Sequence, residues 1–370
     1  MLNIIENFFS NKCYVLLEPS FLTELVETAR KKVSSFSKLS EISDIYPTTF
    51  STYKNSKERA ISFSKLAILL DISQLKLFKD HILSVRTSRS GYNLSSKILF
   101  NDKSWKIFDK WDHYLLGVLA SDGHVFNSNF YFRQTIKDVE FSAVQIFTLF
   151  NLVKKIHYND KKIHFYITED KSSRYGGPQN KIIFSSAPFN IFLSDILSMK
   201  FDTNYSIPFW LDSNKSYAYS WLGGLTDGDG SVIHSYDKKY NRFISRWDIC
   251  NGAIEPLISI KNLLEIFFGE IKSNPNLGSK GKYVFNVGTM KNLSKLLPSI
   301  LPTIVIERKR KKIIQLLDYL NDKGFGIKID KKQRTTRNPI MDDVVRFLEE
   351  NSWLKKLTNY ERLETYGEIL

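Results

Sequence analysis

Residues 114–123 read Tyr114-Leu-Leu-Gly-Val-Leu-Ala-Ser-Asp122-Gly123, and residues 221–230 read Trp221-Leu-Gly-Gly-Leu-Thr-Asp-Gly-Asp229-Gly230. Both are apolar, glycine-containing segments of helical character that end on an Asp-Gly pair and run into a strand-like stretch. The C-terminal carbonyls of a helix already make that end negative, so a carboxylate there costs up to about 1 kcal/mol. Because this unfavourable placement occurs twice, we expect a positive partner between the two acids, and a divalent cation is the leading candidate.

The composition favours an intracellular protein with an anionic partner. The 370-residue chain is long enough for about two or three domains. A net charge of +14 indicates nucleic acid as the first candidate partner, although a membrane or ribosomal contact gives the same balance. Two cysteines are too few for a disulfide framework, which fits a reducing compartment. The sequence has neither a signal-peptide pattern nor an apolar run long enough for a membrane helix.

Residues 1–105 are expected to form a helical domain. Apolar spacing predicts helices over residues 22–33, 37–45, 48–54, 63–70 and 74–83. Two short helices across a tight turn are typical of a helix-turn-helix. The residues of the second helix that this interpretation directs toward DNA are Thr48, Thr49, Ser51, Thr52, Tyr53 and Lys54. An ordinary helical bundle with a polar face explains these residues equally well.

The rest of the chain is predicted to contain two similar halves, residues 106–212 and 213–325, followed by a basic, helical tail over 326–370. The first half is predicted to have strands at 124–128, 130–137, 162–168 and 181–186, with helices at 139–153 and 189–199. The second half is predicted to have strands at 231–236, 242–250 and 282–288, with helices at 254–268, 293–301 and 306–320. Alternation along these strands predicts antiparallel sheets with an apolar face against helices.

The other face of the predicted sheets carries basic and hydroxyl side chains. A face of this kind is able to lie along a nucleic-acid groove. The candidate DNA contacts are Arg133, Thr135, Lys137, Lys162, His164, Tyr166, Arg242 and Arg246. For any one of them a solvated outer face is the simpler interpretation, so the prediction depends on the recurrence of the pattern in several strands.

These features resemble the LAGLIDADG homing endonucleases of the single-chain type, which carry two copies of the motif. The resemblance spans residues 107–325. On this alignment the metal-binding acids of the family correspond to Asp122 and Asp229, and the glycines that let the two motif helices pack closely correspond to Gly117 and Gly224. The second copy has Asp227 at the sixth motif position, where the first copy has Ala120.

The resemblance implies an α+β fold. Two pseudo-symmetric αββαββα repeats form an antiparallel β-saddle over double-stranded DNA, and the N-terminal helical domain resembles the helix-turn-helix segment of some members. It also implies that Asp122 and Asp229, with the adjoining Gly123 and Gly230, bind Mg²⁺, for which Mn²⁺ substitutes, and that a monomer hydrolyses one phosphodiester in each strand.

The resemblance further implies a lysine beside the two acids. No lysine directly precedes Ile207-Pro208, where intein-borne relatives carry one in the first repeat. Lys200 and Lys282 are the candidate catalytic substitutes.

Three functions remain open from the sequence. The first is a site-specific homing endonuclease that makes a double-strand break. The second is an RNA maturase that assists splicing with the same saddle, which makes intron RNA a second candidate partner. The third is a non-cleaving DNA-binding regulator on the same scaffold. Retention of both Asp122 and Asp229 favours the endonuclease, because a regulator is expected to have lost one or both acids.

Overall fold

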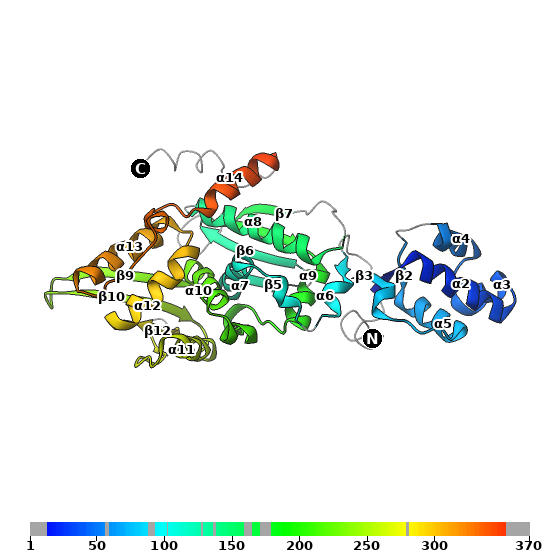
Figure 1. Cartoon of the computed structure of the whole chain (residues 1–370), viewed down its shortest axis with the longest axis horizontal. Coiled ribbons are helices and arrows are strands. Elements are labelled where there is room, and N and C mark those ends of the chain that lie inside the picture. Colours follow the sequence, from blue (N-terminus) through cyan, green and yellow to red (C-terminus); the bar gives the residue numbers. More distant parts are fainter. Residues whose placement is uncertain are drawn as a thin grey trace. The chain divides into compact units, whose positions relative to one another are not determined.

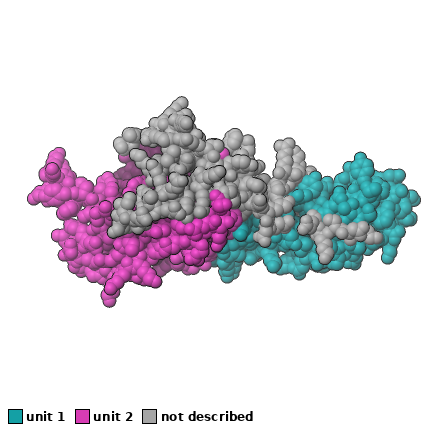
Figure 2. Space-filling model, turned by 90° about the horizontal axis from the view of Figure 1, so that it is seen from above, with its two compact units in different colours: residues 1–107, 153–163, 185–198 teal, residues 108–152, 164–184, 199–370 magenta. Residues whose placement is uncertain are grey.

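The computed structural model describes residues 13–55, 59–87, 93–101, 103–126, 129–135, 138–158, 165–170, 179–278 and 281–352. The chain divides into two compact units (Figure 2). Unit 1 comprises residues 1–107, 153–163 and 185–198, and unit 2 comprises residues 108–152, 164–184 and 199–370. Within the described ranges, the helices are all too short or too polar to cross a membrane.

Unit 1 combines helices with a small antiparallel sheet (Figure 1). Its N-terminal helices are α2 (Pro19–Val33), α3 (Phe36–Ser43), α4 (Pro47–Asn55), α5 (Phe63–Ser73) and α6 (Ser96–Leu99). Its strands are β1 (Cys13–Leu17), β2 (Ile61–Ser62), β3 (Ile82–Thr87) and β4 (Leu94–Ser95), paired in the order β2-β1-β3-β4. The prediction of a purely helical N-terminal region is therefore wrong in omitting this sheet.

The helix predicted over residues 74–83 is also wrong. Gln74 ends α5 in the left-handed conformation (φ 61°), and its N–H donates to the Leu70 carbonyl over 2.9 Å. A single 3-10 turn over Lys79–His81 then leads directly into β3. Strand β3 pairs with β1, which lies far away in the sequence, so local apolar spacing does not reveal it.

Helices α3 and α4 are joined by a tight turn. Asp44 adopts the left-handed conformation (φ 52°), and its carbonyl accepts a hydrogen bond from the Lys65 ammonium. Phe50 and Tyr53 are buried on the inner side of α4, whereas Tyr46 before the helix is 79% exposed. Tyr53 therefore lies in the core and does not face outward, contrary to the sequence interpretation.

The two halves of the rest of the chain run through the same order of elements. The first half contains α7 (Lys110–Asp122), β5 (Gly123–Phe126), β6 (Asn129–Thr135), α8 (Val139–Ile156), β7 (Phe165–Asp170), β8 (Gln179–Ser185) and α9 (Ala187–Ile191), which continues as a π-helical turn over Phe192–Ile196. The second contains α10 (Lys215–Gly228), β9 (Gly230–Asp237), β10 (Arg242–Asn251), α11 (Glu255–Phe268), β11 (Asn276–Leu277), β12 (Tyr283–Val287) and α12 (Met290–Ile300).

The two sheets have the same strand order. One sheet runs β5-β6-β8-β7, and the other, read from its β9 edge, runs β9-β10-β12-β11. The described strand pairs are antiparallel. The predicted class of helices with antiparallel sheets is confirmed by these elements.

Two more helices complete the described chain. They are α13 (Glu307–Asp322) and α14 (Ile340–Glu350), separated by a 3-10 turn over Lys331–Arg334. Phe347 of α14 lies 5.3 Å from Phe147 and 5.0 Å from Phe150 of α8, measured between ring centroids. Helix α14 is thus packed onto a helix of the first half by aromatic side chains.

Candidate active site

Helices α7 and α10 pack against each other through two glycines. A β-carbon at Gly117 would lie 2.0 Å from the Trp221 carbonyl oxygen, and one at Gly224 would lie 1.9 Å from the Tyr114 carbonyl oxygen. Both distances are far inside van der Waals contact, so the helix backbones touch where only glycine fits. This contact brings the C-terminal ends of the two helices close together.

The Gly117→Ala variant is expected to lose about 3 kcal/mol of unfolding free energy, because the added methyl group forces α7 away from α10. Urea denaturation followed by circular dichroism measures this change. Gly288→Ala is the matched control, since a β-carbon there meets nothing closer than 3.8 Å. Equal stabilities of the two variants would show that the helices do not pack through Gly117.

The two acids lie at the converging helix ends. Asp122 is the last residue of α7, and Asp229 caps α10. A β-carbon at Gly228 would lie 3.1 Å from Asp122 Oδ2, so the Asp122 carboxylate lies against the residue that precedes Asp229. Gly123 and Gly230 begin strands β5 and β9 directly after the acids. Asp122 is half-buried, and Asp229 is exposed.

Negative charge is concentrated at this position. Burial and the nearby Asp229 charge raise the pKa of Asp122 to about 8, and the Lys309 charge partly opposes them. Burial and Asp229 also raise the pKa of Tyr205, and burial raises the pKa of Cys250 with further contributions from Asp248 and Asp229. A carboxyl group with a pKa this high gains strongly from a bound cation, which would favour its ionised form.

The donor set fits a magnesium ion. In the described ranges, no three side chains of His, Cys, Asp or Glu gather around a point. A tetrahedral zinc site, which needs three or four such ligands, is therefore not formed by them. Mg²⁺ is commonly held by one or two carboxylates together with water and substrate phosphate, which is what Asp122 and Asp229 offer.

A buried carboxylate links the two motif helices. Asp227 of α10 accepts a hydrogen bond at Oδ2 from the Tyr114 hydroxyl of α7 (3.0 Å) and another from the Val305 N–H (2.6 Å). Burial raises the pKa of Asp227 to about 6, while Lys309 is the largest influence in the opposite direction. The first half has Ala120 in place of Asp227, so this link exists on one side only.

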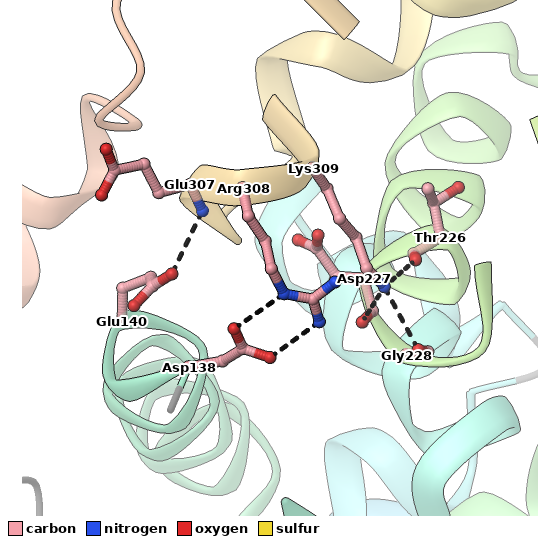
Figure 3. A network of polar contacts seen from close by, with 8 residues as sticks. All are labelled: Asp138, Glu140, Thr226, Asp227, Gly228, Glu307, Arg308 and Lys309. Carbon is pink, nitrogen blue, oxygen red and sulfur yellow. Dashed lines mark hydrogen bonds and ion pairs between the residues drawn. The ribbon is translucent and has the colours of Figure 1, made fainter. Parts of the chain in front are cut away.

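Lys309 of α13 lies at the end of α10. It is 6% exposed, and its Nζ donates to the carbonyl oxygens of Thr226 (2.7 Å), Asp227 (2.7 Å) and Gly228 (3.3 Å) (Figure 3). These are carbonyls of the last turn of α10, which carries negative partial charge. Lys309 therefore neutralises the helix end that carries Asp229.

Residues at the start of α13 also form hydrogen bonds with the first half of the chain. The Arg308 guanidinium donates two hydrogen bonds to Asp138, through Nε to Oδ1 (3.1 Å) and through Nη2 to Oδ2 (2.9 Å). Glu140 accepts from the Glu307 N–H over 3.1 Å, and burial raises the pKa of Glu140 to about 7 (Figure 3). The beginning of α8 is thereby joined to the helix that supports α10.

The basic run at residues 308–312 is only partly a solvent-facing surface. Lys309 is buried, and Arg310 is fully buried. Its guanidinium donates to the carbonyls of Leu301 (2.6 Å), Ile304 (3.2 Å), Gln333 (2.7 Å) and Thr335 (2.6 Å). All three residues form hydrogen bonds within the fold, and Arg308, Lys311 and Lys312 are the exposed members of the run.

The two lysines proposed from sequence are both exposed. Lys200 is exposed and lines a cavity of about 610 Å³ with residues that include Tyr205, Phe209 and Glu255. Lys282 is exposed just before β12. Burial, Asp248 and Asp229 raise the pKa of Cys250, and the Lys282 charge partly opposes this shift. Lys309 was missed because it lies in a run of similar residues.

The structure describes the side chains of only some candidate DNA contacts. Arg242 and Arg246 are exposed on β10, and Arg246 pairs with Asp248 over 2.8 Å. By strand alternation both arginines lie on the face opposite Trp247, which is buried beneath the helices. The backbones of Arg133 and Thr135 belong to β6 and that of Tyr166 to β7. The side chains of these three, and Lys137, Lys162 and His164 entirely, lie outside the described part of the chain.

Several solved structures of LAGLIDADG proteins resemble part of this chain. Mesophilic variants of the homing endonuclease I-DmoI match at 16% identity and a TM-score of 0.35, over 52% of this chain and 94% of theirs. The N-terminal LAGLIDADG domain of WhiA matches at 18% identity and a TM-score of 0.35, over 52% of this chain and 80% of that domain's chain. The homing endonuclease I-WcaI bound to its DNA recognition sequence matches at 13% identity and a TM-score of 0.38, over 57% of this chain and 93% of the endonuclease chain. No protein-family model and no curated protein matches the sequence.

Proposed function

We propose that the chain is a site-specific homing endonuclease that makes a metal-dependent double-strand break in a long DNA target. The observation that carries this proposal is the placement of Asp122 against the end of α10, beside Asp229. Both acids come from one chain, so the proposed enzyme acts as a monomer. A buried lysine and a charge-rich helix end at the same point supply the electrostatic balance of a phosphoryl-transfer site.

Each group has a distinct part in this proposal. Mg²⁺ held by Asp122 and Asp229, with Gly123 and Gly230 adjoining, supplies charge neutralisation at the scissile phosphate and an activated water. The close packing of α7 on α10 fixes the separation of the two carboxylates. Lys309 holds the last turn of α10, and its positive charge favours ionised Asp122. Lys282 is retained as a candidate phosphate contact because it is exposed. The charges of Lys282 and Asp229 both influence the pKa of Cys250, which indicates that both lie near this cysteine.

The polar face of the second sheet is the proposed DNA surface. Arg242 and Arg246 are exposed there, on the side of the sheet away from buried Trp247. Cations on a pleated surface contact phosphates along a groove, and they make the affinity dependent on salt. We propose that α4 of unit 1 adds a further DNA contact, because Tyr46, Thr48 and Ser51 are exposed beside its buried inner face.

Metal removal is the direct test of this function. Full-length protein is incubated with a pool of random duplexes and Mg²⁺, and the ends of cut molecules are sequenced to recover the target. Cleavage of this target is then compared in Mg²⁺, Mn²⁺ and excess chelator. We expect double-strand cleavage with either metal and none with chelator, while duplex binding persists, since phosphate contacts dominate binding.

The competing functions predict other results. Duplex binding without cleavage in any divalent metal would contradict the endonuclease proposal and favour a DNA-binding regulator. Stimulated splicing of an intron RNA without cleavage of its intronless DNA would favour a maturase.

A further inference from the structure

An exposed group of aromatic side chains lies at the tip of the β9–β10 hairpin. Tyr236 is 49% exposed, Tyr240 is 58% exposed and Phe243 is 45% exposed. Large apolar side chains gathered at a surface are typical of interaction sites. We name Tyr236, Tyr240, Phe243 and the adjoining Tyr319 of α13 the aromatic patch.

Two members of the aromatic patch, Tyr236 and Phe243, belong to the helix side of the sheet. Phe243 pairs with Tyr236 across the two strands, and by alternation both share a face with Trp247 and its partner Val232, which are buried. The ring of Phe243 lies 5.1 Å from the ring of Tyr319, measured between centroids. Tyr236 and Phe243 are therefore on the opposite face from Arg242 and Arg246, the proposed DNA contacts.

The rings of the aromatic patch support one another. Phe243 is stacked on His234 at 5.0 Å with an interplanar angle of 13°. Tyr236 contacts the edge of Phe243 at 5.3 Å, and the Tyr236 hydroxyl donates to the Asn241 side chain. Because the rings are already held in place by one another, stacking an unpaired base on them costs little side-chain conformational entropy.

Cations accompany the exposed rings. Lys239 Nζ lies 5.1 Å from the Tyr240 ring centroid, and the Arg242 guanidinium carbon lies 5.3 Å from it. Lys323 Nζ lies 5.5 Å from the Tyr319 ring centroid. The neighbouring acid Asp237 accepts backbone N–H groups of the turn at Oδ1, from Lys239 (2.9 Å) and Tyr240 (3.4 Å). The surface thus alternates aromatic rings with positive charges.

We propose that the aromatic patch binds single-stranded RNA. Unpaired bases would stack on Phe243 and Tyr240, and their phosphates would meet Lys239 and Lys323. A DNA duplex does not fit this surface, because its bases are stacked inside the helix and present no free ring faces. A purely apolar protein partner would leave the cations buried without counter-charges. Unpaired bases are mainly a property of RNA loops and ends, which favours RNA over DNA as the occupant.

The test measures binding of a fluorescent uridine oligomer of about 12 nucleotides, a length within the site size of single-strand binders. Fluorescence anisotropy is recorded for the wild type and for the Tyr236→Ala/Phe243→Ala variant. The variant is expected to bind at least about tenfold more weakly, the effect of losing one stacked base. Phe209→Ala is the matched control, since Phe209 is 67% exposed and lies outside the aromatic patch in the 3-10 turn Phe209–Ser213. This control is expected to bind as the wild type does.

Several results would overturn the proposal. They are unchanged affinity of the double variant, an equal loss with Phe209→Ala, or equal affinity of the wild type for a deoxyuridine oligomer. If the double variant does not fold, Tyr240→Ala replaces it, because Tyr240 is the most exposed ring of the hairpin. Ultraviolet crosslinking of a thiouridine oligomer is then expected to label the peptide containing residues 236–243, and labelling elsewhere contradicts the proposal.

This inference is separate from the proposed cleavage activity. The double variant is expected to cut duplex DNA like the wild type, since neither residue lies on the polar face of the sheet. Conversely, Asp122→Asn is expected to leave RNA binding unchanged. Failure of one activity therefore does not imply failure of the other.

Discussion

Asp122→Asn and Asp229→Asn are each expected to reduce cleavage of the target duplex about a thousandfold or more, because each removes one of two charges that would hold the metal. Asparagine has nearly the same size as aspartate, so the packing of Asp122 against Gly228 is preserved. Single-turnover cleavage with excess enzyme measures the chemical step. Duplex affinity is expected to change by less than about threefold, since it depends on phosphate contacts elsewhere.

The control for these variants is Asp212→Asn, an exposed acid outside the site. It should cut at the wild-type rate. A normal rate for either Asp122→Asn or Asp229→Asn would mean that the reaction takes place elsewhere. Accumulation of nicked duplex would show that each acid serves one strand more than the other.

Lys309→Met is expected to lower the free energy of unfolding by about 4 kcal/mol, the effect of removing one partner from a buried charged group. The change leaves the carbonyls of Thr226 and Asp227 without their donor and the buried Asp227 carboxylate without the positive charge that most opposes its raised pKa. Burial lowers the pKa of Lys309, and the Asp227 charge opposes this effect. Guanidinium denaturation measures the difference.

Lys311→Met is a closely matched control. It makes the same substitution on the same helix, at an exposed position two residues further on. Its effect is expected to stay within about 0.5 kcal/mol. A double variant that adds Asp227→Asn to Lys309→Met should lose about 1 to 3 kcal/mol less than the sum of the single losses, because the two side chains interact. Equal stabilities of Lys309→Met and Lys311→Met would contradict the supporting role of Lys309.

Local periodicity predicts the second half of the chain well. The predicted strand at 242–250 and helix at 254–268 are observed as Arg242–Asn251 and Glu255–Phe268, because alternation and helical spacing are properties of neighbouring residues. Strand Asn276–Leu277 is missed, since two exposed residues contain no pattern. The sheet of unit 1 is missed for the same reason, because its edge strands are two residues long and its central pair joins distant segments.

The two candidate acids could be identified from the sequence, whereas the residue that supports the end of α10, Lys309, could not. Asp122 and Asp229 stand out because each breaks a local preference at a helix end. Lys309 does not, since its neighbours in the run are also basic. One signal was present: Lys309 lies on the same helical stripe as Ile313, Leu316 and Leu320, which are buried. A lysine on an apolar stripe indicates a buried acceptor, although only the folded chain identifies that acceptor as the end of α10.

The single hydrogen bond from Tyr114 to Asp227 makes the two halves complementary rather than interchangeable. In the other motif copy, Trp221 takes the position of Tyr114 and Ala120 takes the position of Asp227. These residues offer neither a hydroxyl group nor a carboxylate. Two copies of the first half would bury a Tyr114 hydroxyl without its acceptor, and two copies of the second would bury Asp227 without this donor. Each orphaned group costs about 1 to 3 kcal/mol. A homodimer rebuilt from either half is therefore disfavoured, and an engineered split protein should reassemble as the mixed pair.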